Sequence, residues 1–408
     1  MFISILAILT AGLLGILVAF FVFEVIAAII SRAPRPRGAL NGRHPNVAVV
    51  VPAHNEGRNL IPTLLDLKAQ LQTGDRLIVV ADNCSDDTVM VAAEFGAEIL
   101  ERNDQTKIGK GYALDWAIQH LKNSHPDVVI FVDADCRIAD GAIGELVDAC
   151  TITFRPAQAR YLMTAHPNSE ISYQVAEFAW LTKNWVRPLG LRALGLPCQL
   201  MGTGMAFPWN VIRSANLASG EIVEDLKLGL DLALAGYPPQ FCPSARVYSV
   251  FPSSAEGHGT QRQRWEKGHI VTIVSSAPRL LIKSLVSRNW GLLFLTLDLM
   301  IPPLSLFSLV LIGGLLIGTL IFIGEGSSAA LLMSIANAIF FGLALIACWV
   351  KFGRDTLPAH AVPSIAYYVL GKLPLYKRIF TGRSVASWIR TDRDHVPPKA
   401  QRNHDPEK

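Results

Sequence analysis

The chain has 408 residues, of which 51% are hydrophobic and 17% are charged, and its mean hydropathy is +0.34. Soluble domains carry roughly 25% charged residues, so part of this chain is expected to lie in a lipid bilayer. The net charge of +4 is mild and no Lys/Arg tract is present, which argues against a nucleic-acid partner. Six scattered cysteines form no CxxC pair, a pattern that argues against a zinc cluster or a disulfide scaffold and suits a reducing compartment.

Residues 1–31 are predicted to form an N-terminal transmembrane anchor. Residues 2–30 hold a single charge, Glu24, and exceed the ~20 apolar residues that a spanning helix needs. A cleaved signal peptide is the alternative, but there is no basic segment before the apolar run and the run is too long. By the positive-inside rule, the arginines that follow predict a cytoplasmic side after this helix and an external N-terminus. They are Arg32, Arg35, Arg37 and Arg43.

Two long apolar segments near the far end, 304–323 and 327–350, are predicted to form a transmembrane hairpin over 304–350. Lys351 and Arg354 follow the second segment, so a hairpin that leaves the cytoplasm returns its basic end to it. The two predicted halves of the topology therefore agree.

Two shorter apolar stretches flank this hairpin. Residues 290–301 end at a Pro-Pro pair and residues 357–370 are interrupted by prolines, so both are expected to be interfacial or re-entrant. We therefore expect an interfacial segment over 271–303 and an interfacial helix with a basic tail over 351–408. A third spanning helix through 290–303 is the alternative, and it would reverse the side of the C-terminus.

Residues 44–270 alternate between buried strands and amphipathic helices. Continuous apolar runs such as "NVAVVVPAH" (46–54) and "VVIFVDAD" (128–135) are typical of buried parallel strands. The run 55–71 has leucines at helical spacing, and 86–96 reads as a helix that ends at a glycine. This βαβα rhythm predicts an open parallel sheet with helices on both faces, in which ligands bind at the carboxyl ends of the strands.

Polar clusters follow three of the predicted strands: His54-Asn55-Glu56, Asp82-Asn83, and Asp133 with Asp135. Asp133 and Asp135 are two residues apart and share one face of a strand, where two ionised carboxylates repel each other. A hard divalent ion such as Mg²⁺ relieves that repulsion and binds substrate phosphates, so the pair predicts a metal site for a di- or triphosphate. A helix N-cap beside a surface acid is the alternative. A phosphatase with Asp133 as nucleophile is a further alternative, although such a motif normally lies in the first strand.

Two later segments carry further chemistry. Glu224 and Asp225 open a predicted helix, where acids suit the helix dipole and a carboxylate can also act as a general base. The segment "TQRQRWEKGH" (260–269) places arginines around Trp265, a combination that can bind phosphates and stack on sugars. A basic interfacial helix beside anionic lipid explains the same residues without a substrate.

Together these segments resemble a known family. "VVVPAHNE", "VVADNCSDDT", "KGYAL", "VDAD", "GTGMAF", "VEDLKLGLDLALAGY" and "QRQRW" occur in the order seen in membrane-embedded family 2 glycosyltransferases, such as cellulose, hyaluronan and poly-N-acetylglucosamine synthases. The end of the chain, "KLPLYKRI…SWIRTDRD", looks like the tail of bacterial exopolysaccharide members. The resemblance implies a GT-A-type, Rossmann-like, mostly parallel α/β sheet over 44–270, flanked by one N-terminal and two or three C-terminal transmembrane helices.

The resemblance also implies roles for individual residues. Asp82 would contact the nucleobase, with His54, Asn55 and Glu56 nearby, and Lys110 would contact the nucleotide. Asp133 would face the ribose or the metal, and Asp135 would coordinate Mg²⁺ or Mn²⁺. Asp225, with Glu224 beside it, would deprotonate the acceptor hydroxyl. Arg264 would bind the diphosphate, and the acceptor would lie against Gly202, Thr203, Gln261 and Trp265.

The resulting prediction is an inverting, metal-dependent transfer from a UDP-sugar to a saccharide or lipid-linked acceptor, in exopolysaccharide or cell-surface glycan synthesis. The catalytic region would lie on the cytoplasmic face of the inner membrane in a multi-pass protein, with a homo-oligomer or an export partner possible. The alternative from a different class is a catalytically degenerate, UDP-binding subunit of a polysaccharide export complex. The "GTGMAF" segment lacks some signature residues of the named synthases, and no regulatory domain follows the last predicted helix.

Overall fold

The computed structural model describes residues 2–31, 44–166, 169–220, 223–252 and 255–381. The four arginines after the first apolar segment, and the chain from residue 382 onward, lie outside the described residues. The positive-inside argument and the basic tail therefore stay sequence predictions.

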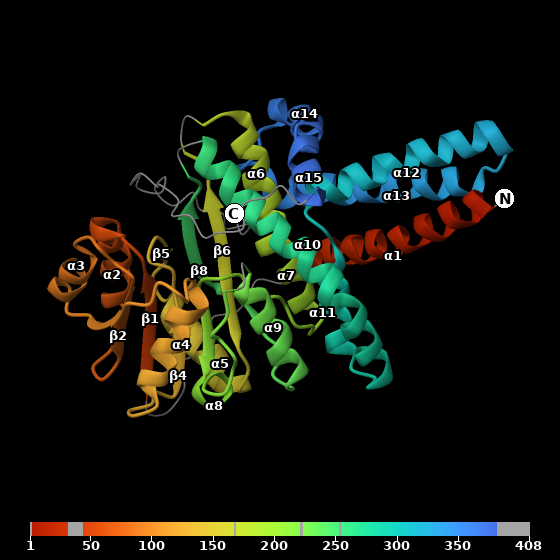
Figure 1. The fold of residues 1–408 in the computed structure, drawn as a ribbon. Helices are drawn as coiled ribbons and strands as arrows, with labels where there is room; N and C mark the ends of the chain where they lie inside the picture. Colours follow the sequence, from red (N-terminus) through yellow and green to blue (C-terminus); the bar gives the residue numbers. More distant parts are fainter. Residues whose placement is uncertain (1, 32–43, 167–168, 221–222, 253–254, 382–408) are drawn as a thin grey trace.

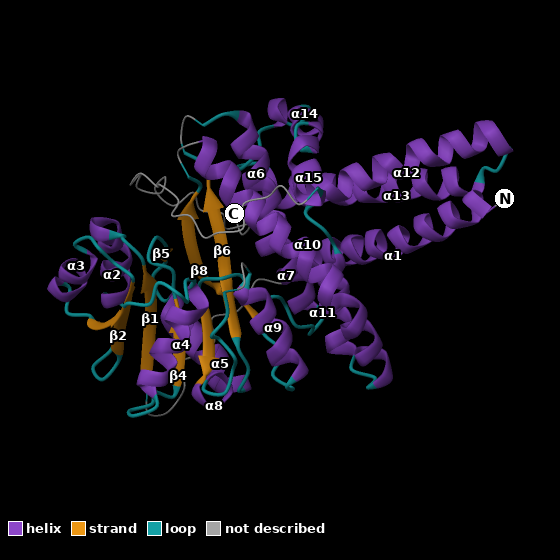
Figure 2. Ribbon diagram, viewed as in Figure 1, coloured by secondary structure: helices purple, strands orange, loops and turns teal. Residues whose placement is uncertain are grey.

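A sheet of eight strands, in the order β3-β2-β1-β4-β7-β6-β8-β5, forms the centre of the polar region (Figure 2). The strands β3, β2, β1 and β4 are parallel neighbours, as predicted. The other half is mixed, because β7 runs antiparallel to both β4 and β6, and β5 antiparallel to β8. The strands are β1 (Val47–Ala53), β2 (Arg76–Asp82), β3 (Glu98–Arg102), β4 (Val128–Phe131), β5 (Arg137–Ile138), β6 (Ala157–Thr164), β7 (Met205–Pro208) and β8 (Gln240–Val250).

The antiparallel half follows from the path of the chain after β6. There the chain leaves the sheet for α6 (Ile171–Leu181), a π-helical turn η2 (Thr182–Val186) and α7 (Arg187–Ala193), and then returns as β7 in the opposite direction. The simple βαβ rhythm that predicts a parallel sheet holds only up to β4. The fold is therefore a mixed α/β sheet rather than a uniformly parallel one.

Helices cover both faces of the sheet, and strand β1 shows why. Val47, Val49 and Val51 pack into one core with η1 (Gly57–Leu60), α2 (Ile61–Lys68) and α5 (Ala142–Thr153). The alternate residues Ala48 and Val50 pack into the opposite core. That second core is closed by α4 (Lys110–Leu121), α8 (Trp209–Ile212) and α9 (Glu224–Leu234), while α3 (Thr88–Glu94) lies beside β3. Because strand side chains alternate, an uninterrupted valine run is buried on both sides.

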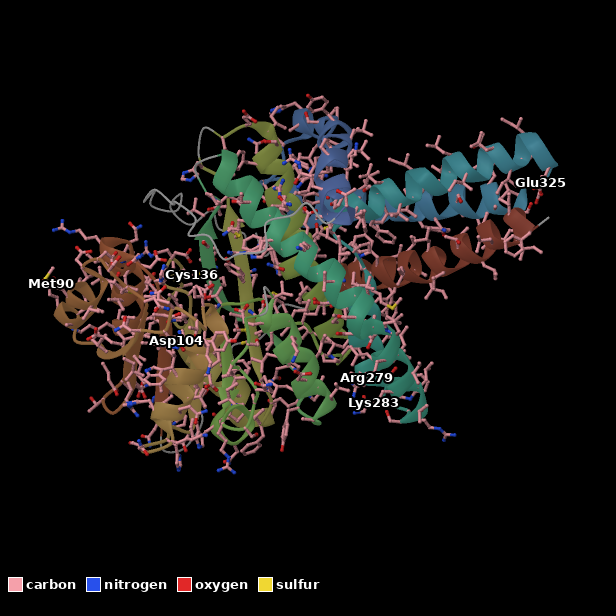
Figure 3. The ribbon with its side chains drawn as sticks, viewed as in Figure 1. Met90, Asp104, Cys136, Arg279, Lys283 and Glu325 are labelled. Carbon is pink, nitrogen blue, oxygen red and sulfur yellow. The ribbon has the colours of Figure 1, made fainter. Side chains whose placement is uncertain are left out.

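Three long apolar helices pack side by side and extend away from the sheet (Figure 1). They are α1 (Phe2–Ile30), α12 (Leu304–Glu325) and α13 (Ala329–Cys348). The far end of this bundle holds the start of α1 and the turn between α12 and α13, where the Ser4 hydroxyl donates to Glu325. Figure 3 labels Glu325 at that tip. The three segments predicted to span the membrane are thus helices that are long enough to do so, and they pack side by side.

A fourth helix is also long and apolar enough to cross a membrane: the Gly259–Val286 part of α10 (Ala255–Val286). This helix was not predicted as a span. It forms a hairpin with α11 (Trp290–Met300), and Leu280 and Leu295 of that hairpin share a core with Leu226 of α9. Arg279 and Lys283 lie on its far half (Figure 3). The helices that follow the bundle are short: η3 (Trp349–Gly353), η4 (Ala359–Ala361), α14 (Ser364–Leu370) and α15 (Leu373–Phe380).

The single charge of the first apolar segment has a defined partner. The Arg187 Nε atom of α7 donates to Glu24 Oε2 over 2.9 Å, and its Nη2 atom pairs with Asp298 of α11. All three side chains are buried. Gly190, one turn after Arg187, lies so close to α1 that an added Cβ would meet the Glu24 carbonyl oxygen at 2.0 Å. The anchor helix is therefore built into the sheet-containing region.

Candidate active site

The carboxyl ends of β1, β2 and β4 meet at one edge of the sheet, because these strands are parallel and adjacent. The predicted cluster residues follow these strands directly, so His54, Asp82 and Asp133 reach the same edge. Two of the turns there need a left-handed backbone, with φ of 55° at Asn55 and 53° at Asn83. Asparagine adopts that conformation more readily than most residues, which explains its place in both turns.

Asp82 lies in a small polar network at this edge. Its Oδ1 atom accepts a 2.6 Å hydrogen bond from Arg102 at the end of β3 and a 3.1 Å bond from the Asn83 amide. The His54 Nδ1 atom lies 2.6 Å from the Asp82 carbonyl oxygen, which joins the ends of β1 and β2. Burial raises the pKa of Asp82, and the Arg102 guanidinium opposes that shift. The network keeps a carboxylate in place where the strand ends.

The loop after β1 is held by backbone contacts to the next turn. The Asn55 side-chain oxygen accepts a 2.7 Å bond from the Ser85 backbone N–H. The Glu56 and Gly57 N–H groups both donate to the Thr88 hydroxyl over 2.9 Å. The positions of Asn55 and Glu56 relative to Asp82 are therefore fixed by the fold.

Lys110, the first residue of α4, lies at the centre of a cluster of acids. Its ammonium group forms an ion pair with Asp133, lies 3.9 Å from Glu224 Oε1 and donates to the Gly202 carbonyl oxygen over 2.7 Å. The Asp133 backbone N–H donates to the Thr203 hydroxyl over 3.0 Å. The "KGYAL", "VDAD", "GTGMAF" and "VED" segments are thus brought together by four different elements.

Burial changes the proton affinity of this cluster. Burial favours the neutral form of the Lys110 amine, but Asp133 and Glu224 outweigh it and raise the pKa of Lys110. Burial raises the pKa of Glu224 to about 7, against the opposing charge of Lys110. Burial raises the pKa of Asp225 as well, again opposed by Lys110. Perturbed carboxylates in one cluster with a buried cation are typical of functional sites.

Gly202 lies against the Asp225 carboxylate. That glycine has a φ of 91°, which side chains of L-residues rarely tolerate, and an added Cβ would lie 3.4 Å from Asp225 Oδ2. Gly111 has a similar role behind Lys110, because an added Cβ would meet the Leu217 carbonyl oxygen at 2.5 Å. Both motif glycines therefore allow segments to approach each other closely around the acids.

Asp133, Asp135 and Cys136 form a group whose potential ligand atoms all lie within 4.8 Å of one another. The two carboxylates are partly exposed and offer the oxygen ligands that Mg²⁺ and Mn²⁺ prefer. The Cys136 thiol is fully buried and is a soft ligand, so it suits such an ion poorly. The turn that carries the pair is held by Thr63, whose hydroxyl lies 2.7 Å from both the Ala134 and the Cys136 carbonyl oxygens. The residues present fit a hard divalent cation.

The "QRQRW" segment forms part of α10, where Gln261 and Trp265 line a cavity of about 150 Å³. The Trp265 ring packs on Trp180 of α6, with ring centroids 5.0 Å apart. Arg264 is half-buried and does not line this cavity. The structure therefore separates the predicted acceptor residues into two groups, with Gly202 and Thr203 beside Lys110, and Gln261 and Trp265 around the cavity.

Several residues of this region were not singled out from the sequence. Arg102 binds Asp82 from the neighbouring strand, and its only sequence signal is a cation at the end of the third strand. Trp180 and Lys183 belong to a helix that reads as an ordinary apolar segment, with nothing to indicate that it faces Trp265. Such contacts depend on tertiary packing between distant segments.

Comparison with known families identifies residues 44–268, more than half of the chain, as "Glycosyltransferase like family 2". Among curated proteins, the chain is 26% identical over 255 residues to the 4,4'-diaponeurosporenoate glycosyltransferase of Staphylococcus haemolyticus, which covers 58% of this chain and 64% of that protein. It is 27% identical over 244 residues to the probable glycosyltransferase YdaM of Bacillus subtilis, covering 55% of each. The matches thus span less than two thirds of either relative.

Among solved structures, the chain resembles the mannosyltransferase PcManGT from Pyrobaculum calidifontis in complex with GDP-Man and Mn²⁺. The likeness covers 86% of this chain and 97% of that one, with a TM-score of 0.52 and 14% sequence identity. It shows a shared GT-A-like fold. The family match, the curated names and the fold agree, and the chain belongs to glycosyltransferase family 2.

Proposed function

We propose that this family 2 glycosyltransferase is an inverting, metal-dependent enzyme that transfers a sugar from a UDP-sugar to a saccharide or lipid-linked acceptor at a membrane surface. The observation that carries the proposal is the partly buried cluster in which Lys110 meets Asp133 and Glu224, with Asp225 beside them. It combines a cation for a diphosphate, a carboxylate at a strand end and a carboxylate pair at a helix start. Each of these groups can serve sugar transfer from a nucleotide donor, by binding the diphosphate, holding a metal ion or accepting a proton.

The donor would bind along the edge of the sheet. Asp82, held by Arg102, would contact the nucleobase, and the loop of His54, Asn55 and Glu56 would lie beside it. Lys110 would contact the diphosphate, since its ammonium group already lies among oxygen atoms. Arg264 would add a second cation to the diphosphate.

Asp133 and Asp135 would hold a Mg²⁺ or Mn²⁺ ion, which when bound neutralises the charge of the departing nucleoside diphosphate. Asp225 would accept the proton of the acceptor hydroxyl as that oxygen attacks the anomeric carbon from the side opposite the diphosphate. One displacement of this kind inverts the anomeric configuration. Glu224, with a pKa of about 7, would lie beside Asp225 and would carry a negative charge only as the pH rises above neutrality.

The membrane arrangement belongs to the same proposal. Helices α1, α12 and α13 would span the inner membrane, and the hairpin of α10 and α11 would lie at its interface. The catalytic region would face the cytoplasm, with the start of α1 and the α12–α13 turn outside. The product would be an exopolysaccharide or cell-surface glycan, formed with or without an export partner or a second copy of the chain.

The test uses the purified full chain with a panel of UDP-sugars, with and without Mg²⁺ or Mn²⁺. We expect divalent-dependent hydrolysis or transfer from at least one donor. The Asp225→Asn variant should keep UDP affinity and lose about 10²–10⁴-fold in transfer, the usual contribution of a general base. Normal transfer by this variant would refute the role of Asp225. Tight UDP binding with no turnover on any donor would instead indicate a degenerate, non-catalytic subunit.

A further inference from the structure

The cavity beside Trp265 lies between the catalytic region and the membrane bundle. Its walls come from α6, α10 and α14 and from the bundle helices α12 and α13, and they are mostly aliphatic and aromatic. Leu304 of α12 and Leu345 of α13 line it and are also partly exposed, so the wall continues into the apolar surface of the bundle. The cavity, of about 150 Å³, has room for a small hydrocarbon group against its apolar walls.

Lys183 brings an ammonium group to this apolar cavity. It belongs to the π-helical turn η2, a rare conformation that is frequent at functional sites. The neighbouring residues Thr182 and Asn184 are buried, whereas the Lys183 side chain is accessible to solvent because it projects into the cavity. Among the described residues Lys183 makes no hydrogen bond or ion pair, and its one aromatic contact is to the Trp180 ring, with Nζ 6.0 Å from the centroid.

Other charged groups around the cavity have partners. Arg187 pairs with both Glu24 and Asp298, so its charge is compensated. Glu266 pairs with Lys372 over 3.2 Å. Lys183 differs from Arg187 and Glu266 because it has no ion-pair partner in the described part of the chain. No carboxylate described there lies within ion-pair distance of its ammonium group. An ammonium group without a counter-ion at the wall of a largely apolar cavity can form a charge-assisted hydrogen bond with an anionic ligand there.

The position of Lys183 links the cavity to the catalytic cluster. Burial lowers the pKa of Lys183, and the charge of Asp225 opposes this shift. Conversely, Lys183 is one of the cations that lower the pKa of Asp225. The two groups are therefore close enough to interact electrostatically, and Lys183 lines the cavity whereas Asp225 does not. A molecule bound to Lys183 can place a neighbouring hydroxyl near Asp225.

We propose that the acceptor is an anionic amphiphile: Lys183 binds its phosphate or carboxylate, and its hydrocarbon chain occupies the cavity beside Trp180 and Trp265 and continues along α12 into lipid. The inference rests on the proposed transferase function and narrows the acceptor class. Lys183 would be an acceptor-binding residue, separate from the donor residues around Lys110. A lysine is a compact point charge, which suits either anionic group.

The experiment measures binding of three probes that share one tail, namely dodecyl phosphate, dodecanoate and dodecanol, to the full chain in phosphatidylcholine nanodiscs. We expect wild type to bind at least one of the two anions about tenfold or more tighter than the alcohol, the ratio expected for one charge-assisted hydrogen bond. Lys183→Met should abolish that preference while leaving dodecanol affinity unchanged. A preference for the phosphate over the carboxylate, or the reverse, identifies which anion the natural acceptor carries.

Three further variants make the result decisive. Lys183→Arg should keep the preference for anions. Ala179→Phe, which adds a ring to the cavity wall, should weaken the binding of all three probes. Lys122→Met, at an exposed lysine that follows the last residue of α4 and does not line the cavity, should change nothing. UDP affinity reports whether each variant is folded. An unchanged anion preference in Lys183→Met, or equal affinity of wild type for all three probes, would overturn the proposal. Donor hydrolysis tests the transferase function separately, because it needs no amphiphile.

Discussion

Lys110 forms an ion pair with Asp133. Lys110 is predicted to contact the nucleotide and Asp133 to face the metal or the ribose, so the pair joins two predicted donor-binding residues. The pair joins the start of α4 to the end of β4. Burial alone would favour a neutral Lys110, and the neighbouring carboxylates keep it charged. Under the proposed function, a diphosphate would meet a cation that is already charged and held in position, which is the preorganisation expected of an enzyme that stabilises a charged leaving group.

Replacing Lys110 by Met should weaken donor binding strongly. Asp133, Glu224 and Asp225 would then lie together without the cation that now compensates them, and the diphosphate would lose its ammonium contact. We expect at least about a tenfold loss of UDP affinity, measured by calorimetry. Lys107→Met is the matched control, because Lys107 is close in sequence but exposed, and it should bind UDP normally. Equal UDP affinity in both variants would contradict this role of Lys110.

The stability of the protein without divalent ions should depend on pH through Glu224. The folded pKa of about 7 lies above the usual 4.5, so between these values the folded state holds a proton that the unfolded state has released. Stability from this group therefore falls as pH rises through that window. Glu224→Gln should have little effect on Tm at pH 4.5 and should raise it relative to wild type at pH 8. A constant difference at both pH values would show that Glu224 does not titrate near neutrality.

Gly202→Ala should impair catalysis. The substitution would force an L-residue to adopt a φ of 91° beside Asp225, whose Oδ2 atom would lie 3.4 Å from the added Cβ, so the loop is strained and its backbone is expected to shift. We expect kcat to fall by about tenfold or more, because small displacements of catalytic groups cost about 10²-fold in well-positioned sites. Gly144→Ala is the control, since an added Cβ there meets nothing within 4 Å. Equal kcat values for the two variants would show that catalysis does not depend on a glycine at position 202.

Arg187→Met should destabilise the fold more than most substitutions. It would leave the buried Glu24 and Asp298 carboxylates facing each other without a cation, and breaking a buried ion pair in this way typically costs about 3–5 kcal/mol. Thermal or denaturant unfolding in detergent measures the loss. Arg279→Met, on the exposed surface of α10, should unfold like wild type (Figure 3). A loss below about 1 kcal/mol for Arg187→Met, the range of exposed pairs, would argue against the ion triad.

Much of the fold was predictable because local patterns agree with it. The valine runs that end in acids predicted strands β1, β2 and β4, and parallel pairing brings their ends together as expected. The antiparallel strand β7 was not predicted, because its direction depends on how α6 and α7 return the chain and not on its own four residues. The length of α10 was missed for a similar reason: its polar first half and apolar second half look like two segments.

The candidate site was predictable where a motif places its residues at the ends of elements. Lys110, Asp133, Glu224 and Asp225 come together because three helix or strand ends meet at one edge of the sheet. The roles of Arg102 and Lys183 could not be predicted, because each role depends on contacts with a segment that is distant in the sequence. A lone arginine in "ILER" or a lone lysine in "WLTKNWV" gives no periodic or spacing signal.

The close contact between Gly190 and the Glu24 carbonyl has a consequence for how the protein can be divided. A catalytic region prepared from residue 44 onward would keep every motif of family 2 but would lose one wall of its own core. Phe178 and Trp185 would lose the apolar surface formed by Phe21 and Val25, and Arg187 would lose one of its two carboxylates. The first helix, which is long and apolar enough to span a membrane, is thus also a structural wall of the enzyme. Removing this helix would increase solubility but would leave the fold incomplete.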